Sequence, residues 1–379
     1  MELIERNHCI ASGKKDLELL YSFKDFPVFM GCVTHSPDKD LKVDMNWWIS
    51  KSTGSLQLNP LIPLEILYAD SHGSGSIGSI WIQHHEEFAR FVHNYDIKRA
   101  LEIGAGQHSI LSKNYLEMVP DAEWTIIEPN PPLESSNIRI IRGMFDRNFS
   151  MDHQVDAIIH SHVIEHLYEP QELIAKVSQS LEQGQLHIFS VPRLDIMLKR
   201  KYTNCINFEH TVFLTEPFID YLLFINRFEI LEKHYFLDDH SIFYACRKMA
   251  DSKKHVAVPN EYQKNKQMFE EYLAFHLNLI NDLNDKIKSH NGKVFLFGGH
   301  IFSQYLIGFG LDEKKIDCIL DNDPNKQGKR LYGTSLKVES PEILKTLENV
   351  AVILRTGGYN KEIKNDIVKN INPDVEFWE

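Results

Sequence analysis

The sequence predicts an α/β protein that contains two parallel sheets. Helical and strand patterns alternate strictly between residues 81 and 246, and a shorter alternation of the same kind occupies residues 293 to 354. The first alternation includes a glycine-rich bend, Gly104-Ala105-Gly106, directly after a strand pattern. Strands that alternate with helices form parallel sheets covered on both faces, and ligands bind beyond the carboxyl ends of the strands.

The composition predicts a soluble chain of two or three domains. The chain has 379 residues and a net charge of −12 without a basic run. This charge argues against a protein that binds nucleic acid through its phosphates. Its five scattered cysteines argue against a disulfide framework. The first residues lack a signal-peptide pattern, and no apolar run approaches the roughly 20 residues of a membrane span. We therefore expect a cytoplasmic protein with neither nucleic-acid nor membrane partners.

Each element of the first alternation follows from its pattern. Residues 1 to 78 carry turn formers and short apolar runs, with small strands expected at 28–30 and 47–49. An amphipathic helix is expected over Trp81–Asn94 and another over Glu172–Leu181. The strands are expected at residues 99–103, 124–128, 138–141, 155–160, 185–191, 228–231 and 241–246.

The last third of the chain predicts a long helix and a second α/β unit. Apolar residues repeat at three and four over residues 262 to 288, and Asn291-Gly292 marks a helix stop. Strands are expected at 293–297, 318–321 and 350–354. The domain organisation predicted from these patterns is a small N-terminal domain, a central α/β core, a helical linker and a C-terminal α/β domain, over residues 1–78, 79–249, 250–290 and 291–379.

The glycine bend is a candidate nucleoside site. Bare backbone at Gly104, Ala105 and Gly106 lets N–H groups approach a ligand closely. The dinucleotide fingerprint would have a third glycine at Ser109, so that match is incomplete. An acid, Glu102, precedes the bend, and Glu128 ends the next strand, where an acid can bind both ribose hydroxyls. The alternative is an ordinary strand-to-helix turn.

Residues after the next two strands are expected to line the same pocket. Met144 and Phe145, in the turn before Asp146, are candidates to hold an adenine, although an ordinary turn explains them equally well. Ser161 and His162 begin a histidine-rich segment after the fourth strand. Its spacing is not H-E-x-x-H, so we interpret it as a pocket-lining loop and predict no metal.

These motifs together resemble those of the class I S-adenosylmethionine-dependent methyltransferases. The resemblance rests on four segments in order: Glu102-x-Gly104-x-Gly106, Glu128, His162-Val163-Ile164-Glu165-His166 and Glu182-Gln183-Gly184. It implies a Rossmann-like core with S-adenosylmethionine as cofactor. The cofactor-binding residues that it implies are those of the bend and the strand ends, namely Glu102, Gly104, Ala105, Gly106, Glu128, Pro129, Met144, Phe145, Ser161 and His162.

Within that class, the chain resembles the nucleotide-sugar C-methyltransferases over almost its whole length. Gln57-Leu58, Tyr68 and Ser74-Gly75 look like the family's N-terminal part, and Asn207-Phe208-Glu209-His210 is similar to its Tyr-x-Glu-His segment. The most distinctive match is the C-terminal run from Asp321 to Lys329. The resemblance implies a small N-terminal domain, a methyltransferase core and a second Rossmann-like domain, acting on a nucleotide-linked 4-keto-deoxysugar as a monomer or homodimer.

The chain departs from this family at three places. The family binds a structural zinc through two Cys-x-x-Cys pairs, and the matching residues here are Cys9 with Ser12 and Ser50 with Thr53. One thiol cannot build a tetrahedral zinc site, so we predict no zinc and a domain held by apolar packing. Asn207 replaces the family's tyrosine, and His72 replaces an aromatic residue before Ser74-Gly75.

The expected chemistry centres on His210. C-methylation beside a ketone needs a base for the α-proton and donors for the enolate. His210 is the candidate base because an imidazole titrates near neutrality, and Glu209 is expected to orient it or to hold substrate. His72 and Asn207 are further candidate catalytic residues. If Glu209 and His210 lie on a strand they point to opposite faces and cannot both serve, and a loop-capping role is the alternative.

Three other functions remain open at the level of sequence. The same histidine could deprotonate a sugar hydroxyl for O-methylation. Either glycine turn, including Gly298-Gly299 followed by Asp321, could hold NAD in an oxidoreductase. A non-catalytic cofactor-binding homologue is the third alternative. For the second turn, a domain that completes the fold is the favoured interpretation.

Overall fold

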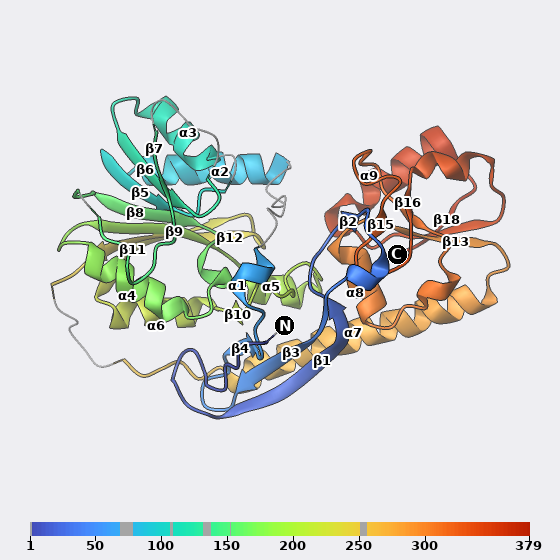
Figure 1. Cartoon of the computed structure of the whole chain (residues 1–379), viewed down its shortest axis with the longest axis horizontal. Helices are drawn as coiled ribbons and strands as arrows, with labels where there is room; N and C mark the ends of the chain where they lie inside the picture. The colour runs from blue at the N-terminus through green and yellow to red at the C-terminus, as the bar shows by residue number, and fades with distance from the viewer. Residues whose placement is uncertain (1, 69–78, 107–108, 132–137, 152, 251–255) are drawn as a thin grey trace. The chain divides into compact units, whose positions relative to one another are not determined.

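The computed structural model describes the whole chain except residues 1, 69–78, 107–108, 132–137, 152 and 251–255 (Figure 1). It divides into two compact units. Unit 1 comprises Met1–Glu18, Ile49–Met197 and Glu209–Asn265, and unit 2 comprises Leu19–Trp48, Leu198–Phe208 and Lys266–Glu379. Residues 1–78, predicted as one small domain, are therefore shared between both units. The division into four predicted domains stays a prediction.

Unit 1 is built on a seven-stranded sheet, and its mainly parallel strands confirm the predicted α/β class. The strand order is β11-β12-β9-β8-β5-β6-β7. The bounds in chain order are β5 (Arg99–Ile103), β6 (Glu123–Glu128), β7 (Ile138–Arg142), β8 (Ala157–Ser161), β9 (Leu186–Pro192), β11 (Phe228–Phe236) and β12 (Ser241–Lys248). β5 to β9 are parallel, whereas β12 runs antiparallel to both β9 and β11.

The strand order fixes where a ligand can bind. β5 pairs with β6 on one side and with β8 on the other, so the order of winding reverses between β5 and β8. The five parallel strands follow the 3-2-1-4-5 part of the doubly wound Rossmann order, in which the binding crevice opens at this reversal. A sixth parallel strand would come next in the dinucleotide-binding order, and the antiparallel β12 takes its place here.

Helices cover both faces of this sheet (Figure 1). Helices α2 (Ser79–His93) and α3 (Ile110–Met118) pack on one face, where Phe88 and Tyr115 join a buried core with Ile126 and Ile159. Helices α4 (Pro170–Ser180) and α6 (Glu216–Ile225) pack on the other. Successive strand residues point to opposite faces, so alternate residues enter the two cores.

Short N-terminal elements complete unit 1. β4 (Leu56–Leu58) pairs with β10 (Val212–Phe213), and α1 (Leu64–Leu67) follows β4. The buried Arg6 donates to the carbonyls of Leu58 and Thr211 at 2.8 and 2.6 Å. A guanidinium with several carbonyl partners satisfies a buried segment that has little sheet around it. The shorter elements of this unit are η2 (Ile164–His166) and α5 (Leu194–Lys199).

The four positions that match the family's zinc ligands lie in unit 1. Cys9 Sγ lies 3.2 Å from Thr53 Oγ1, and Ser50 Oγ donates to Asp16 Oδ1 at 2.9 Å. Hydroxyl contacts therefore occupy positions where the family has thiolates. Cys9 also belongs to the buried apolar core of this unit.

Unit 2 contains a five-stranded parallel sheet in the order β16-β14-β13-β17-β18, again 3-2-1-4-5. The bounds are β13 (Lys293–Phe297), β14 (Ile319–Leu320), β16 (Val338–Glu339), β17 (Val350–Ile353) and β18 (Glu376–Trp378). The predicted long helix is α7 (Tyr262–Ser289). The remaining helices are α8 (Ile301–Gly308), α9 (Asn360–Asp366), η1 (Pro37–Lys39), η3 (Glu313–Lys315), η4 (Pro341–Thr346), η5 (Gly357–Tyr359) and η6 (Ile367–Ile371).

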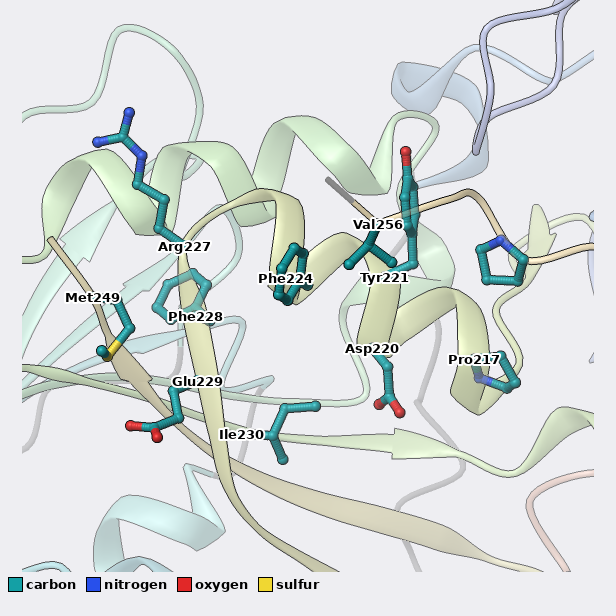
Figure 2. A pocket seen from close by; sticks show the side chains of 11 residues that line it. Pro217, Asp220, Tyr221, Phe224, Arg227, Phe228, Glu229, Ile230, Met249 and Val256 are labelled. Carbon is teal, nitrogen blue, oxygen red and sulfur yellow. The ribbon is translucent and has the colours of Figure 1, made fainter. Parts of the chain in front are cut away.

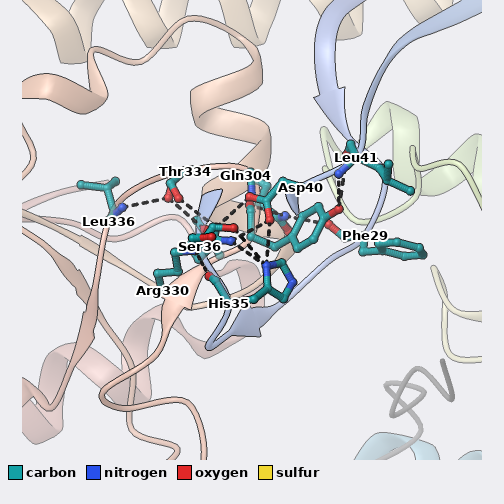
Figure 3. A network of polar contacts seen from close by, with 12 residues as sticks. Phe29, His35, Ser36, Asp40, Leu41, Gln304, Arg330, Thr334 and Leu336 are labelled. Carbon is teal, nitrogen blue, oxygen red and sulfur yellow. Dashed lines mark hydrogen bonds and ion pairs between the residues drawn. The ribbon is translucent and has the colours of Figure 1, made fainter. Parts of the chain in front are cut away.

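A buried ion pair holds the 19–48 segment within unit 2 (Figure 3). Arg330 binds Asp40 with both terminal nitrogens at 2.7 Å and donates from Nε to the carbonyl of His35 at 2.7 Å. Beside this pair, β2 (Cys32–Val33) forms a two-stranded ladder with β15 (Arg330–Leu331). The bidentate geometry is the strong form of a carboxylate–guanidinium contact.

The first strands differ from the prediction. The strand expected at 28–30 does not form, whereas 47–49 lies within the longer β3 (Lys42–Ser50). β1 (Leu17–Pro27) was not predicted: its buried residues, Phe23 and Phe26, are three positions apart rather than two, and Phe23 packs on residues far along the chain. In the part of the chain that is described, none of the helices has the length and apolarity to cross a membrane.

Candidate functional site

The glycine bend lies where the strand order reverses, and both glycines have left-handed backbone. Gly104 and Gly106 have φ of 72° and 59°. The Gly104 amide donates to the carbonyl of Ile127 at 3.0 Å, which fixes the bend against β6. A Cβ on Gly104 would lie 2.9 Å from Val163, whereas one on Gly106 would meet no atom of the described residues within 4 Å. The backbone at Gly106 therefore fronts open space, as a close approach by a ligand requires.

Glu128 is joined to this bend. Its carboxylate accepts from the amide of Gly106 at 3.3 Å and from that of Asn130 at 3.0 Å. The side chain is partly exposed at the carboxyl end of β6. An acid in this place beside a bare bend can take ribose hydroxyls, as expected from the sequence.

Glu102 differs from Glu128 in its surroundings. It is 3% exposed, and Trp124 Nε1 donates to its carboxylate at 2.8 Å. Burial, together with the charge of Glu128, raises the pKa of Glu102 to about 7. The two acids are thus electrostatically coupled, but Glu102 lies beneath the bend and supports it from the core.

Ser109, the position of the missing third glycine, also has left-handed backbone, with φ of 47°. It precedes α3 and is buried. The Ser112 hydroxyl donates to its carbonyl at 2.9 Å. A non-glycine residue in this region carries strain, so the turn keeps the glycine-type conformation without the glycine. Ala105 packs against the core beneath α2 and α3.

The other predicted cofactor residues gather at the same edge of the sheet. The Gly143 amide donates to the carbonyl of Glu128 at 3.2 Å, which places the turn of Met144 and Phe145 beside that acid. Met144 is 51% exposed, and Phe145 packs 5.3 Å from the ring of Phe149.

Three more predicted residues are held by hydrogen bonds. The carbonyl of Pro129 accepts from Arg142 at 3.2 Å, and Ser161 Oγ lies 2.8 Å from Ser190 Oγ. His162 has φ of 52°, and its amide donates to the carbonyl of Ser190 at 3.0 Å. These contacts fix the loops after β6 and β8.

A second group of polar side chains, the acceptor cluster, surrounds His166. It comprises Tyr68, Glu165, His166, Glu209 and His210. The His210 ring lies 5.0 Å from that of His166, and Glu209 Oε2 lies 4.0 Å from His166 Nδ1. Tyr68 Oη lies 3.5 Å from the same nitrogen. Glu209 and His210 lie in a loop rather than on a strand, so both approach one imidazole.

Burial controls the charge of the acceptor cluster. It lowers the pKa of His166 to about 4 against the opposing effect of Glu165, and it raises the pKa of Glu165. His166 is therefore a neutral imidazole near pH 7, able to donate or accept a single proton. Glu165 and His166 belong to the histidine-rich segment that was predicted as a pocket-lining loop, without a separate role for either residue. Their position directly after the fourth strand was the signal that pointed to them.

The remaining predicted catalytic residues are Asn207 and His72. Asn207 belongs to unit 2, where its amide donates to the carbonyl of Asn204 at 3.4 Å. His72, with Ser74 and Gly75, falls outside the described residues. Their predicted roles stay predictions.

A cavity of about 670 Å³ lies between α6 and β11 (Figure 2). Its lining includes the aromatic side chains of Tyr221, Phe224 and Phe228. β11 is the edge strand of the sheet, and three strands separate it from β5, so this cavity is distinct from the bend.

The second glycine turn, in unit 2, is filled by protein. The Gly299 amide donates to Asp321 Oδ2 at 2.7 Å, and Lys326 Nζ binds the same oxygen at 3.0 Å. Cys32 Sγ donates to the Gly299 carbonyl at 3.1 Å and lies 2.9 Å from where a Cβ would stand. Asp321, the acid that would bind a ribose, is thus already paired with the Gly299 amide and Lys326.

Comparisons with known proteins give structural likenesses alone. No family model and no curated protein matches the chain. The plantazolicin methyltransferase BpumL, solved with a substrate analogue and SAH, is similar at 12% identity and a TM-score of 0.37 over 45% of this chain and 84% of that one. The N-methyltransferase NodS from Bradyrhizobium japonicum, solved with S-adenosyl-L-homocysteine, is similar at 16% identity and a TM-score of 0.36 over 47% of this chain and 92% of that one. The mitomycin 7-O-methyltransferase MmcR is similar at 12% identity and a TM-score of 0.39 over 48% of this chain and 62% of that one. With all three TM-scores below 0.5, any function must be argued from the residues of this chain.

Proposed function

We propose that the chain is an S-adenosylmethionine-dependent methyltransferase. The observation that carries the proposal is the bend at Gly106, which fronts open space where the strand order reverses and is hydrogen-bonded to Glu128. Bare amides beside an acid suit a nucleoside with free ribose hydroxyls. When bound, S-adenosylmethionine supplies an electrophilic methyl group on a charged sulfur.

An NAD-dependent oxidoreductase fits these features less well. Ser109 takes the place of the third fingerprint glycine, and the antiparallel β12 replaces the sixth parallel strand of the dinucleotide-binding order. The second turn is filled by Cys32 and Lys326.

We further propose that the acceptor is a nucleotide-linked 4-keto-deoxysugar methylated at carbon. This part rests on the family resemblance and on the acceptor cluster. An imidazole nitrogen of His210 takes the proton from the carbon beside the ketone, and Glu209 holds the ring or the sugar. Neutral His166 and the Tyr68 hydroxyl are the nearby groups able to donate to the enolate oxygen. O-methylation by the same base is the alternative.

Calorimetric titration with S-adenosyl-L-homocysteine tests the cofactor. Glu128→Gln should weaken binding about tenfold or more, because it removes the charged acceptor of the ribose hydroxyls. Glu123→Gln, at the opposite and exposed end of the same strand, is the matched control and should bind normally. Binding of NADH with no affinity for S-adenosyl-L-homocysteine would overturn the proposal.

Turnover with a panel of sugar nucleotides tests the acceptor. His210→Asn should lower kcat at least about a hundredfold while leaving cofactor binding intact. Carbon-13 NMR of the product, made with labelled cofactor, distinguishes a C-methyl from an O-methyl group. Tight cofactor binding without any product would favour the non-catalytic homologue.

A further inference from the structure

Three histidines from separate elements converge at the carboxyl edge of the seven-stranded sheet. His84 lies on α2, His162 follows β8, and His240 directly precedes β12. One ring nitrogen from each lies within 4.8 Å of the other two. Because β12 is antiparallel, it begins at the edge where the parallel strands end. This three-histidine cluster adjoins the acceptor cluster, because Glu165 of the acceptor cluster lies 3.2 Å from His162 Nδ1.

His84 is the independent sign that the cluster holds a ligand. Its exposure is 0%, and within the described part of the chain neither of its ring nitrogens has a hydrogen-bond partner. Leaving a buried donor or acceptor without a hydrogen-bond partner destabilises the folded state. The other fully buried histidines of this unit, His160 and His187, avoid half of that destabilisation because their Nε2 atoms pair at 3.0 Å.

We propose that His84, His162 and His240 bind a divalent transition metal ion of the zinc type. Three imidazoles are a ligand set that suits zinc, copper, nickel or iron and does not suit calcium or magnesium. Three nitrogen ligands leave a fourth position for water or for an oxygen of a bound substrate. The metal site goes beyond the proposed methyl transfer and does not depend on it.

A buried carboxyl group lies beside the cluster. Glu165 Oε1 lies 3.2 Å from His162 Nδ1, and within the described part of the chain neither oxygen of Glu165 has a hydrogen-bond partner. A metal-binding imidazole commonly donates its other N–H to a carboxylate, so a small rotation of the His162 ring would bring Glu165 into that role.

Only a small movement is needed for coordination. In this structure the Ser241 hydroxyl lies 2.9 Å from His162 Nε2 and 2.6 Å from His240 Nδ1. Ligand nitrogens around a tetrahedral zinc are about 3.4 Å apart, so the rings must approach by about 1 Å. The metal then replaces the contacts with Ser241 and supplies a partner for His84.

Cobalt(II) titration of the full chain, after removal of metal with a chelator, tests the site without any cofactor present. We expect one equivalent to bind with the visible absorption of tetrahedral cobalt and to be displaced by zinc. His84→Gln should lose at least about tenfold in affinity, since one of three ligands is gone. His93→Gln, an exposed histidine at the end of the same helix, should bind as the unchanged protein does.

Two further measurements keep the test decisive. If His84→Gln does not fold, His240→Asn replaces a less buried ligand, and circular dichroism with chelator confirms the fold before titration. Zinc should raise Tm in the unchanged protein and in His93→Gln but not in the ligand variants. Absence of tetrahedral cobalt absorption would overturn the proposal. The proposal would also be overturned if the cobalt absorption disappeared in His210→Asn but persisted in His84→Gln, because that result would place the ion in the acceptor cluster.

Discussion

The two parallel sheets share a plan and differ in what occupies their glycine turns. Both follow the 3-2-1-4-5 order, and in both the first strand ends in a glycine turn whose amide binds an acid on the next strand. In unit 1 a Cβ on Gly106 would meet only open space, whereas in unit 2 one on Gly299 would strike Cys32. A glycine turn with an acid therefore marks a possible nucleoside site, and the neighbouring side chains decide whether a ligand can enter.

The largest effect should come from the segment that closes the second turn. Arg330→Ala leaves the Asp40 carboxylate buried and without its bidentate partner. Removing one member of a buried pair costs about 3–5 kcal/mol, so the free energy of unfolding of unit 2 should fall by that amount. Urea unfolding followed by tryptophan fluorescence measures it, and Lys24→Ala, from an exposed pair, is the control.

Blocking the first turn should have the next largest effect. Gly106→Val places a branched side chain in the open space and should weaken S-adenosyl-L-homocysteine binding at least about a hundredfold, or about 2.7 kcal/mol. Gly184→Val is the matched control, because that glycine also has left-handed backbone and open space at its Cβ. Equal losses in both variants would attribute the effect to backbone strain and contradict an open turn as the binding site.

The acid beneath the first turn should make stability depend on pH. Burial raises the pKa of Glu102 to about 7 from 4.5, so the folded state binds the proton more tightly than the unfolded state does. Its contribution is present below pH 4.5 and is lost as pH rises through about 7. Glu102→Gln keeps an acceptor for Trp124. Its free energy of unfolding, relative to that of the unchanged protein, should rise by about 2 kcal/mol as the pH is raised from about 5 to about 8. A stability difference that does not vary with pH would contradict the buried position.

The smallest effect is expected at the second turn. Lys326→Met removes a partly exposed partner of Asp321, whose carboxylate keeps the Gly299 amide. The loss should be about 1 kcal/mol in the stability of unit 2, with cofactor affinity unchanged. A loss of cofactor affinity would mean that the second turn takes part in binding.

Sequence patterns predicted the strands of the first sheet and three of the five strands of the second, because these strands are mainly apolar and are followed by turn formers. Arg99–Ile103 and Lys293–Phe297 needed no distant partner to be recognised, whereas the two- and three-residue strands β16 and β18 were missed. β1 was missed because its burial depends on side chains from the far end of the chain, such as Tyr305 and Phe309 against Phe23. Such contacts leave no local period in the sequence.

The candidate site was predictable only in part, for a related reason. Spacing along the chain identified Gly104, Gly106 and Glu128, because consecutive strands of a parallel sheet end at one edge. It did not distinguish the buried Glu102 from the partly exposed Glu128, since both follow the same pattern. His84, His162 and His240 come from three separate elements, and only the fold brings them together.

The interleaving of the two units constrains how the protein is made. The chain passes between them after Glu18, Trp48, Met197, Phe208 and Asn265. All the residues of unit 1 are therefore present only after residue 265 has been synthesised, and all those of unit 2 only after residue 379 has been synthesised. Neither unit can be released by a single cut, and β1 lacks its packing partners Tyr305 and Phe309 until those residues have been synthesised.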